Sequence, residues 1–110
     1  MFAVLSARVG SIDDIRLGGW VSFRASMAAM NMTMKTIAIE HARRWPDGVV
    51  ASLHPGTVAT GLSEPFRSRV PADKLFTPEV AAAHLLGVVD GLTPDDTGGF
   101  FAWDDSRITY

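Results

Sequence analysis

The pattern of apolar and polar residues divides the 110-residue chain into five regular segments separated by loops. Short apolar runs at 1–6, 49–53 and 99–103 predict three buried strands. A stretch without proline or glycine at 21–44 predicts a long helix, and 78–91 predicts a second one. This strand, helix, strand, helix, strand order is typical of an α/β fold with parallel strands and right-handed crossovers.

Three strands make only a small sheet with long apolar edges. We find no internal repeat, low-complexity tract or linker, so residues 1–110 are interpreted as a single domain. The pattern predicts part of a doubly wound, Rossmann-type parallel sheet with about three strands and two main helices. The apolar strand at 1–6 is expected to be fully buried, which requires neighbours on both sides.

The helix expected at 21–44 carries apolar residues on two opposed faces. At about 100° per residue, one face holds Phe23, Met27, Met30, Met34, Ile37 and His41. The other face holds Val21, Ala25, Ala28, Met32 and Ile39. A surface helix needs only one apolar stripe, so we expect a sheet on one side and a helix or second chain on the other. Candidate association contacts are Ala25, Ala28, Met32 and Ile39.

The helix at 78–91 is expected to begin at Thr77, as N-cap, followed by Pro78 at its first position. Apolar residues lie on more than one face of it, so we expect this helix also to be largely covered. The segment between residues 62 and 76 is predicted to be irregular.

Composition excludes several kinds of partner and site. A formal charge of −2 provides no basic surface for nucleic acid or an anionic membrane. The chain has no cysteine, which excludes disulfides and cysteine-based zinc sites and fits a cytoplasmic location. Its three histidines, at 41, 54 and 84, have no carboxylates at ligand spacing, so no metal site is expected. No apolar run has the length of a membrane span, and no signal peptide is expected.

Four segments resemble motifs of one enzyme family. They are Leu-Ser-Ala-Arg-Val-Gly-Ser-Ile at 5–12, Phe-Arg-Ala-Ser-Met-Ala-Ala-Met-Asn at 23–31, His-Pro-Gly-Thr-Val-Ala-Thr at 54–60 and Gly-Gly-Phe-Phe-Ala-Trp-Asp at 98–104. In this order and spacing the chain resembles the short-chain dehydrogenases/reductases. It is most similar to the branch with the C-factor signalling proteins and the sniffer-type carbonyl reductases.

The resemblance implies a catalytic tyrosine, lysine and serine at three positions that hold other residues here. Phe23 stands at the tyrosine position, Met27 at the lysine position and Ala7 at the serine position. Phenylalanine and methionine cannot exchange a proton. The nearby hydroxyls are those of Ser6 and Ser11, which are more simply explained by hydrogen bonds at the strand end. The Phe23–Met27 pair is likewise most simply explained by helix packing.

The resemblance also implies NAD or NADP as cofactor. In the family, the loop after the second predicted strand faces the nicotinamide, which makes Pro55, Gly56, Thr57, Val58 and Thr60 candidate cofactor-binding residues. The family's glycine-rich phosphate-binding fingerprint does not occur in these 110 residues and would lie before Met1. We therefore expect that the chain alone does not bind the cofactor.

By descent the chain is expected to be an NAD(P)-dependent carbonyl/alcohol oxidoreductase, inactive as it stands. One alternative is a non-catalytic association module that pairs with its own copy or with an intact relative. The other is a truncated gene product with no separate function. A glycine-rich fingerprint encoded in frame upstream would favour truncation, and a stable oligomer of the 110 residues would favour association.

Overall fold

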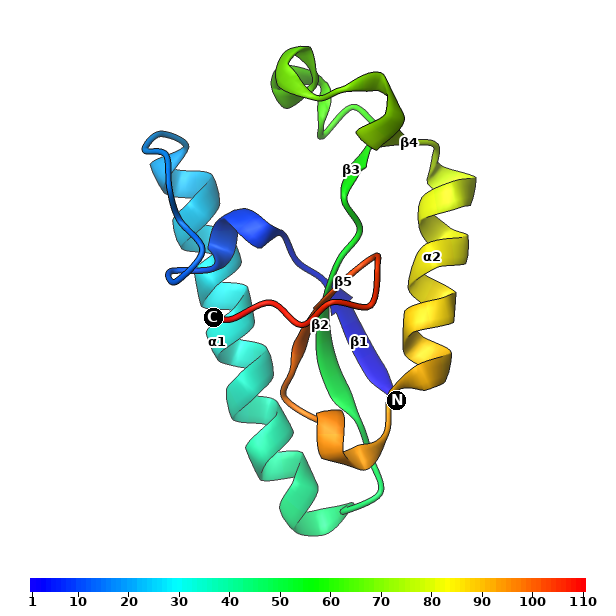
Figure 1. Cartoon of the computed structure of the whole chain (residues 1–110). Coiled ribbons are helices and arrows are strands. Elements are labelled where there is room, and N and C mark those ends of the chain that lie inside the picture. Colours follow the sequence, from blue (N-terminus) through cyan, green and yellow to red (C-terminus); the bar gives the residue numbers. More distant parts are fainter.

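A computed structural model of the chain describes residues 1–65 and 67–110 and has the expected α/β architecture (Figure 1). Three strands and two helices alternate along the chain. They are β1 (Phe2–Leu5), α1 (Val21–Arg44), β2 (Val50–His54), α2 (Pro78–Gly91) and β5 (Phe100–Ala102). The fold-class prediction is confirmed, and both helices have the predicted bounds.

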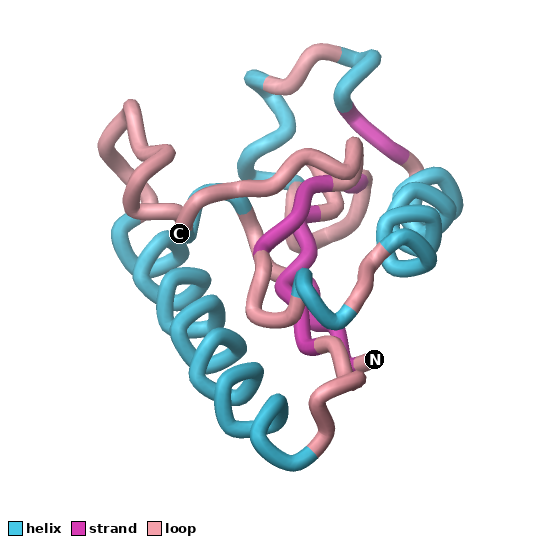
Figure 2. Tube along the Cα trace, turned by 60° about the horizontal axis from the view of Figure 1, so that its bottom comes forward, coloured by secondary structure: helices cyan, strands magenta, loops and turns pink.

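The main sheet is parallel throughout, with strand order β1-β2-β5. Its two faces are covered by different helices, and the strands lie between α1 and α2 (Figures 1 and 2). On the α1 side, Met34 and Ala38 pack on Val50. On the α2 side, Val88 packs with Ala51, Leu53 and Phe101. Neighbouring residues of β2 therefore serve opposite faces, as the two-residue period of a strand requires.

Local signals explain where the helices begin and end. The Thr77 side chain accepts a hydrogen bond from the backbone N–H of Val80 and caps α2. α1 ends at Arg44, where the Trp45 N–H still donates to the His41 carbonyl and Pro46 cannot continue the ladder. Its last turn holds cationic side chains, which suit the negative end of the helix dipole.

Two predictions about burial are wrong. β1 was expected to have neighbours on both sides, but within the described residues it pairs only with β2. As an edge strand it leaves Phe2 58% and Leu5 59% exposed. The second helix was expected to be largely covered, yet Leu86 is 64% exposed. One face of α2 packs against the main sheet, and residues on its outer face, such as Leu86, stay in solvent.

A second, two-stranded sheet joins the loop after β2 to the end of the segment that was predicted to be irregular. β3 (Thr57–Val58) runs parallel to β4 (Leu75–Phe76), with Val58 opposite Phe76. These strands are too short to show periodicity in the sequence. Their pairing places the loop that follows β2 beside the start of α2.

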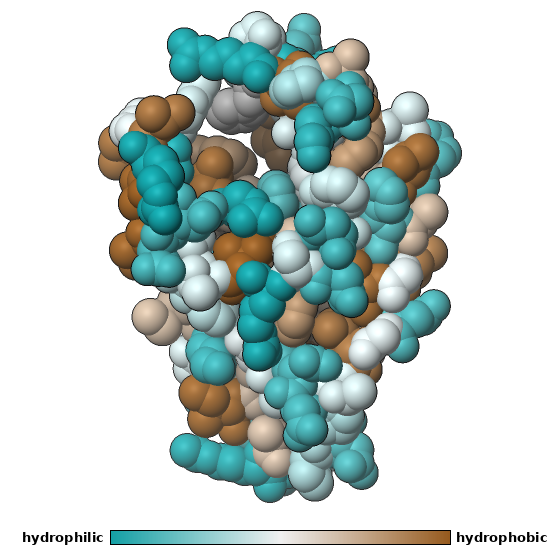
Figure 3. Space-filling view, viewed as in Figure 1, coloured by the Kyte–Doolittle hydropathy of each residue, from teal (hydrophilic) through white to brown (hydrophobic). Residues whose placement is uncertain are grey.

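The outer face of α1 is uncovered. Val21 is 77% and Met32 69% exposed, Ile39 and Ala25 are also exposed, and Ala28 is half-buried. Figure 3 shows apolar patches over both helices interrupting an otherwise polar surface. Among the described residues, neither helix combines the length and the apolar character needed to cross a bilayer.

Candidate functional site

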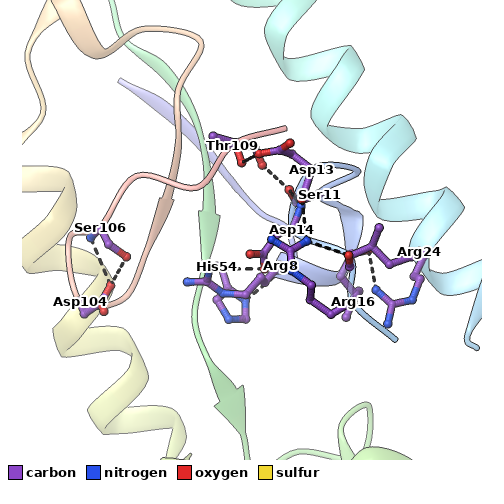
Figure 4. A network of polar contacts seen from close by, with 12 residues as sticks. Arg8, Ser11, Asp13, Asp14, Arg16, Arg24, His54, Asp104, Ser106 and Thr109 are labelled. Atoms are coloured by element: carbon purple, nitrogen blue, oxygen red, sulfur yellow. Dashed lines mark hydrogen bonds and ion pairs between the residues drawn. The ribbon is translucent and has the colours of Figure 1, made fainter. Parts of the chain in front are cut away.

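The candidate site lies at the carboxyl ends of β1 and β2. Ligands of open α/β folds bind outside this edge of the sheet. Two loops meet there, one after each strand. The backbone N–H of Arg8, in the first loop, donates to Nδ1 of His54, at the end of β2, over 3.3 Å (Figure 4). One hydrogen bond thus joins segments that are 46 residues apart in the chain.

The first half of α1 packs against the loop after β1. Gly10, in the short 3₁₀ turn Arg8–Gly10, touches the helix so closely that a Cβ there would lie 2.7 Å from the Met27 carbonyl carbon. Met27 and Phe23 are both half-buried and lie one turn apart on α1. The contact with Gly10 thus places Met27 against the loop whose Arg8 N–H bonds to His54. Neither Met27 nor Phe23 can donate or accept a proton.

The two serine hydroxyls near Ala7 face the interior. Ser6 is 5% exposed, and its Oγ donates to Oδ1 of the buried Asn31 over 2.7 Å. Ser11 is also buried, and its Oγ donates to the backbone carbonyl of Thr109 and accepts from the N–H of Asp14. Both hydroxyls are engaged in holding the loop to α1 and to the C-terminal tail.

The loop with the five predicted cofactor-binding residues is held by an aromatic cluster of Phe76, His84 and Trp103. The ring centroids of the cluster lie 4.8–5.1 Å apart. Gly56 has φ +79° and lies so close that a Cβ would meet the Phe76 ring at 2.7 Å and Trp103 at 3.0 Å. The loop backbone is also occupied, since the Ala59 N–H donates to the Phe76 carbonyl. The same loop, at the edge of the sheet, carries the other four predicted residues, which are Pro55, Thr57, Val58 and Thr60.

His54 is the histidine closest to this edge, and its ring is neutral at neutral pH. Because Nδ1 accepts the Arg8 N–H, the proton of the neutral ring lies on Nε2. Burial, and next the Arg8 charge, lower the pKa of His54 from 6.5 to about 4, against the opposing effect of Asp104 and Asp14. The site thus contains a neutral imidazole donor. Its position after a strand was visible in the sequence, but its partner was not.

Sequence reasoning missed a group of arginines at this edge. Arg8, Arg16 and Arg24 line a hollow between the loop after β1 and the first turn of α1. Their even spacing of eight residues was the available signal, but a loop has no periodicity that would place them on one side. Across the described part of the chain, no group of three or more His, Asp or Glu residues could hold a metal ion.

Sequence and fold both link the chain to known oxidoreductases. No family model matches the chain. It is 42% identical over 99 residues to the 1-hydroxy-2-glutathionyl-2-methyl-3-butene dehydrogenase of Rhodococcus sp. (strain AD45), covering 88% of this chain and 41% of that protein. It is 29% identical over 109 residues to the C-signal protein of Myxococcus xanthus, covering 98% of this chain and 60% of that one.

The fold is similar to that of a solved carbonyl reductase from chicken fatty liver, which contains bound NADPH. The TM-score is 0.80 at 26% identity, over 98% of this chain and 42% of the reductase. The chain therefore spans about two fifths of the length of the dehydrogenase and the reductase that it matches. Motifs, fold and relatives agree: the homologues of this chain are oxidoreductases of the short-chain dehydrogenase/reductase family.

Proposed function

We propose that this chain forms the substrate-side and nicotinamide-side part of an NAD(P)-dependent carbonyl/alcohol oxidoreductase, and that it does not catalyse the reaction by itself. The relatives support the reaction class, since one is named as the dehydrogenase of a 1-hydroxy compound and another as an NADPH-bound carbonyl reductase. The position of the candidate site supports the same reaction class. Ligands of open α/β folds bind at the carboxyl ends of the strands, and the Arg8–His54 hydrogen bond joins two loops at that edge.

The inactivity part of the proposal rests on the side chains at that edge. Reduction of a carbonyl requires a proton for the new alkoxide oxygen, and general acids supply it from a titratable group. Ala7, Phe23 and Met27 have none. His54 has a lowered pKa, so only a small fraction of it is protonated near neutral pH. It can donate a hydrogen bond through Nε2, but it is a poor source of a proton at that pH.

The loop from Pro55 to Thr60 fits one wall of a nicotinamide site and no more. Several of its backbone groups are used within the chain, by the β3–β4 pairing and by the Thr60 N–H bond to the Val58 carbonyl. Dinucleotide phosphates need a glycine-rich turn that opens a helix, with N–H groups pointing at the anion. These 110 residues contain no such fingerprint. We propose that a complete cofactor site requires further polypeptide.

Steady-state assays with NADH and with NADPH over a panel of aldehydes and ketones test this proposal. We expect no turnover above the buffer blank, and cofactor binding that is undetectable or on the order of millimolar by fluorescence titration. The double substitution Phe23→Tyr with Met27→Lys is expected to remain inactive, because it does not supply the phosphate site. Cofactor-dependent turnover of the unchanged chain would contradict the inactivity, and rescue by the double variant would show that the 110 residues hold the cofactor.

The exposed outer face of α1 favours association as a second candidate function. Large apolar side chains that stay in contact with water mark interaction surfaces. We propose a homo-oligomer, or a complex with an intact family relative, with Ala25, Ala28, Met32 and Ile39 as contacts. Nucleic acid and membrane are not among the proposed partners. A cytoplasmic location belongs to the same proposal, because a chain without cysteine suits a reducing compartment.

A further inference from the structure

A hollow of about 220 Å³ lies beside the candidate site, between the loop after β1 and the start of α1. Three of the residues that line it are arginines, one is an aspartate and two are apolar. They are Arg8, Val9, Asp14, Arg16, Leu17 and Arg24. Figure 4 shows the three arginines and Asp14 at the same edge of the sheet as His54.

The charges of the hollow do not balance. Arg8, Arg16 and Arg24 contribute three positive charges and Asp14 one negative charge, which leaves +2. The chain as a whole carries −2, so this hollow has the opposite sign to the protein. One ion pair is formed there, between Nη1 of Arg8 and Oδ2 of Asp14 at 3.6 Å. A positive hollow in a negatively charged chain concentrates anions locally.

Hydrogen bonds to the backbone hold two of the guanidinium groups in place. Nε of Arg24 donates to the Gly19 carbonyl at 2.9 Å, and its Nη1 donates to the Val9 carbonyl at 3.4 Å. Nη1 of Arg16 donates to the carbonyls of Asp13 and Ile15. Among the residues that the structure describes, Nη2 of each group has no acceptor. Fixed guanidinium groups with unused donors lose less entropy when they bind a ligand.

We propose that this hollow binds an oxyanion, a carboxylate or phosphate group carried by a ligand. Arginine forks match the planar, two-oxygen geometry of such groups and form charge-assisted hydrogen bonds with them. The apolar side chains of Val9 and Leu17 provide contact for the part of the ligand next to the anion. That the ligand is a substrate of an oxidoreductase rests on the proposed function, whereas binding of the anion does not.

Titrations of the 110-residue chain test the proposal without any activity assay. The probes are succinate, its uncharged analogue succinamide, and inorganic phosphate, all at constant ionic strength set with sodium chloride. Arginine Nε–H resonances are followed by NMR. We expect the signals of Arg8, Arg16 and Arg24 to shift together with one dissociation constant on the order of millimolar. The signals of Arg43 and Arg69, which lie outside the hollow, serve as internal controls.

Comparison of the two anions identifies the source of the ligand group. Tighter binding of succinate points to a carboxylate-bearing ligand, and tighter binding of phosphate to a phosphate-bearing one. Equal shifts with succinamide, or shifts spread equally over Arg43 and Arg69, would overturn the proposal. Oxidoreductase activity plays no part in these readouts, so failure here and failure of the proposed function remain distinguishable.

Two substitutions change the charge of the hollow in opposite directions. Arg8→Gln removes one of the three positive charges of the hollow and its ion pair with Asp14, and we expect it to weaken anion binding about two- to fivefold. Asp14→Asn removes the competing carboxylate and is expected to tighten binding by a similar factor. A variant that failed to fold could not bind the anion more tightly, so tighter binding by Asp14→Asn cannot result from unfolding. Unchanged binding in both variants would also overturn the proposal, and Arg43→Gln is the matched control.

Discussion

Gly10 and Met27 are in direct contact, and the contact leaves no room for a side chain on the glycine. A Cβ at Gly10 would lie 2.7 Å from both the carbonyl carbon and the Cβ of Met27. Backbone atoms in the middle of a helix cannot move aside easily. The absence of a single carbon atom at Gly10 therefore sets how closely the loop after β1 approaches α1.

Gly10→Ala should destabilise the chain through this contact. Overpacking a buried position costs about 1–3 kcal/mol, and we expect a loss of that size in the free energy of unfolding. Urea denaturation followed by circular dichroism measures it. Gly18→Ala is the matched control, because nothing lies within 4 Å of a Cβ built there. Equal stability of the two variants would show that the loop can move away from α1.

Alanine substitutions at Gly56 and Gly19 distinguish the cost of backbone strain from the cost of a steric clash. Both have positive φ, +79° and +94°, but only a Cβ at Gly56 meets other atoms, in the Phe76 and Trp103 rings. Gly19→Ala should cost about 1 kcal/mol for the left-handed backbone alone. Gly56→Ala should cost about 1–3 kcal/mol more, because the ring contacts add to it. The denaturation midpoints of the two variants provide the comparison. Equal losses of stability would mean that the aromatic rings move aside to accept the new Cβ.

His54 should make stability depend on pH. Its pKa is about 4 in the folded chain against an ordinary value of 6.5, so between these values the unfolded chain binds more protons. Stability is therefore complete above pH 6.5 and falls as the pH drops towards 4, by about 2 kcal/mol between pH 6.5 and 5. His54→Gln keeps an acceptor for the Arg8 N–H and removes the titration. If the variant lost stability as steeply as the unchanged chain, His54 would not be the cause.

Association through α1 is tested by placing a charge on its outer face. We expect Met32→Glu and Ala25→Glu to shift an oligomer to monomer at micromolar concentration, because a desolvated carboxylate in an apolar contact costs several kcal/mol. Analytical ultracentrifugation measures the change. Ala82→Glu introduces the same charge on the exposed side of α2 and should leave the association state unchanged. A well-folded monomer of the unchanged chain would remove the association proposal.

The helices and the order of the elements were accessible from the sequence because their signals are local. Thr77 and Pro78 start one helix within two residues, and Trp45 followed by Pro46 ends the other. The spacing of apolar residues along α1 also placed Met34 and Met32 on opposite faces. It predicted a cover for both, whereas Met34 is buried and Met32 is exposed. Periodicity and capping act over a turn or two, so the residues that carry them are neighbours in the chain.

The edge position of β1, the β3–β4 pair and the arginine hollow were decided by the tertiary structure. Apolar content made β1 look buried, but burial depends on which strands lie beside it, and in the described part of the chain only β2 does. Thr57 meets Leu75, and Arg8 meets His54, because the chain turns back over long loops. Contacts between residues so far apart leave no local pattern, and their partners are set by packing alone.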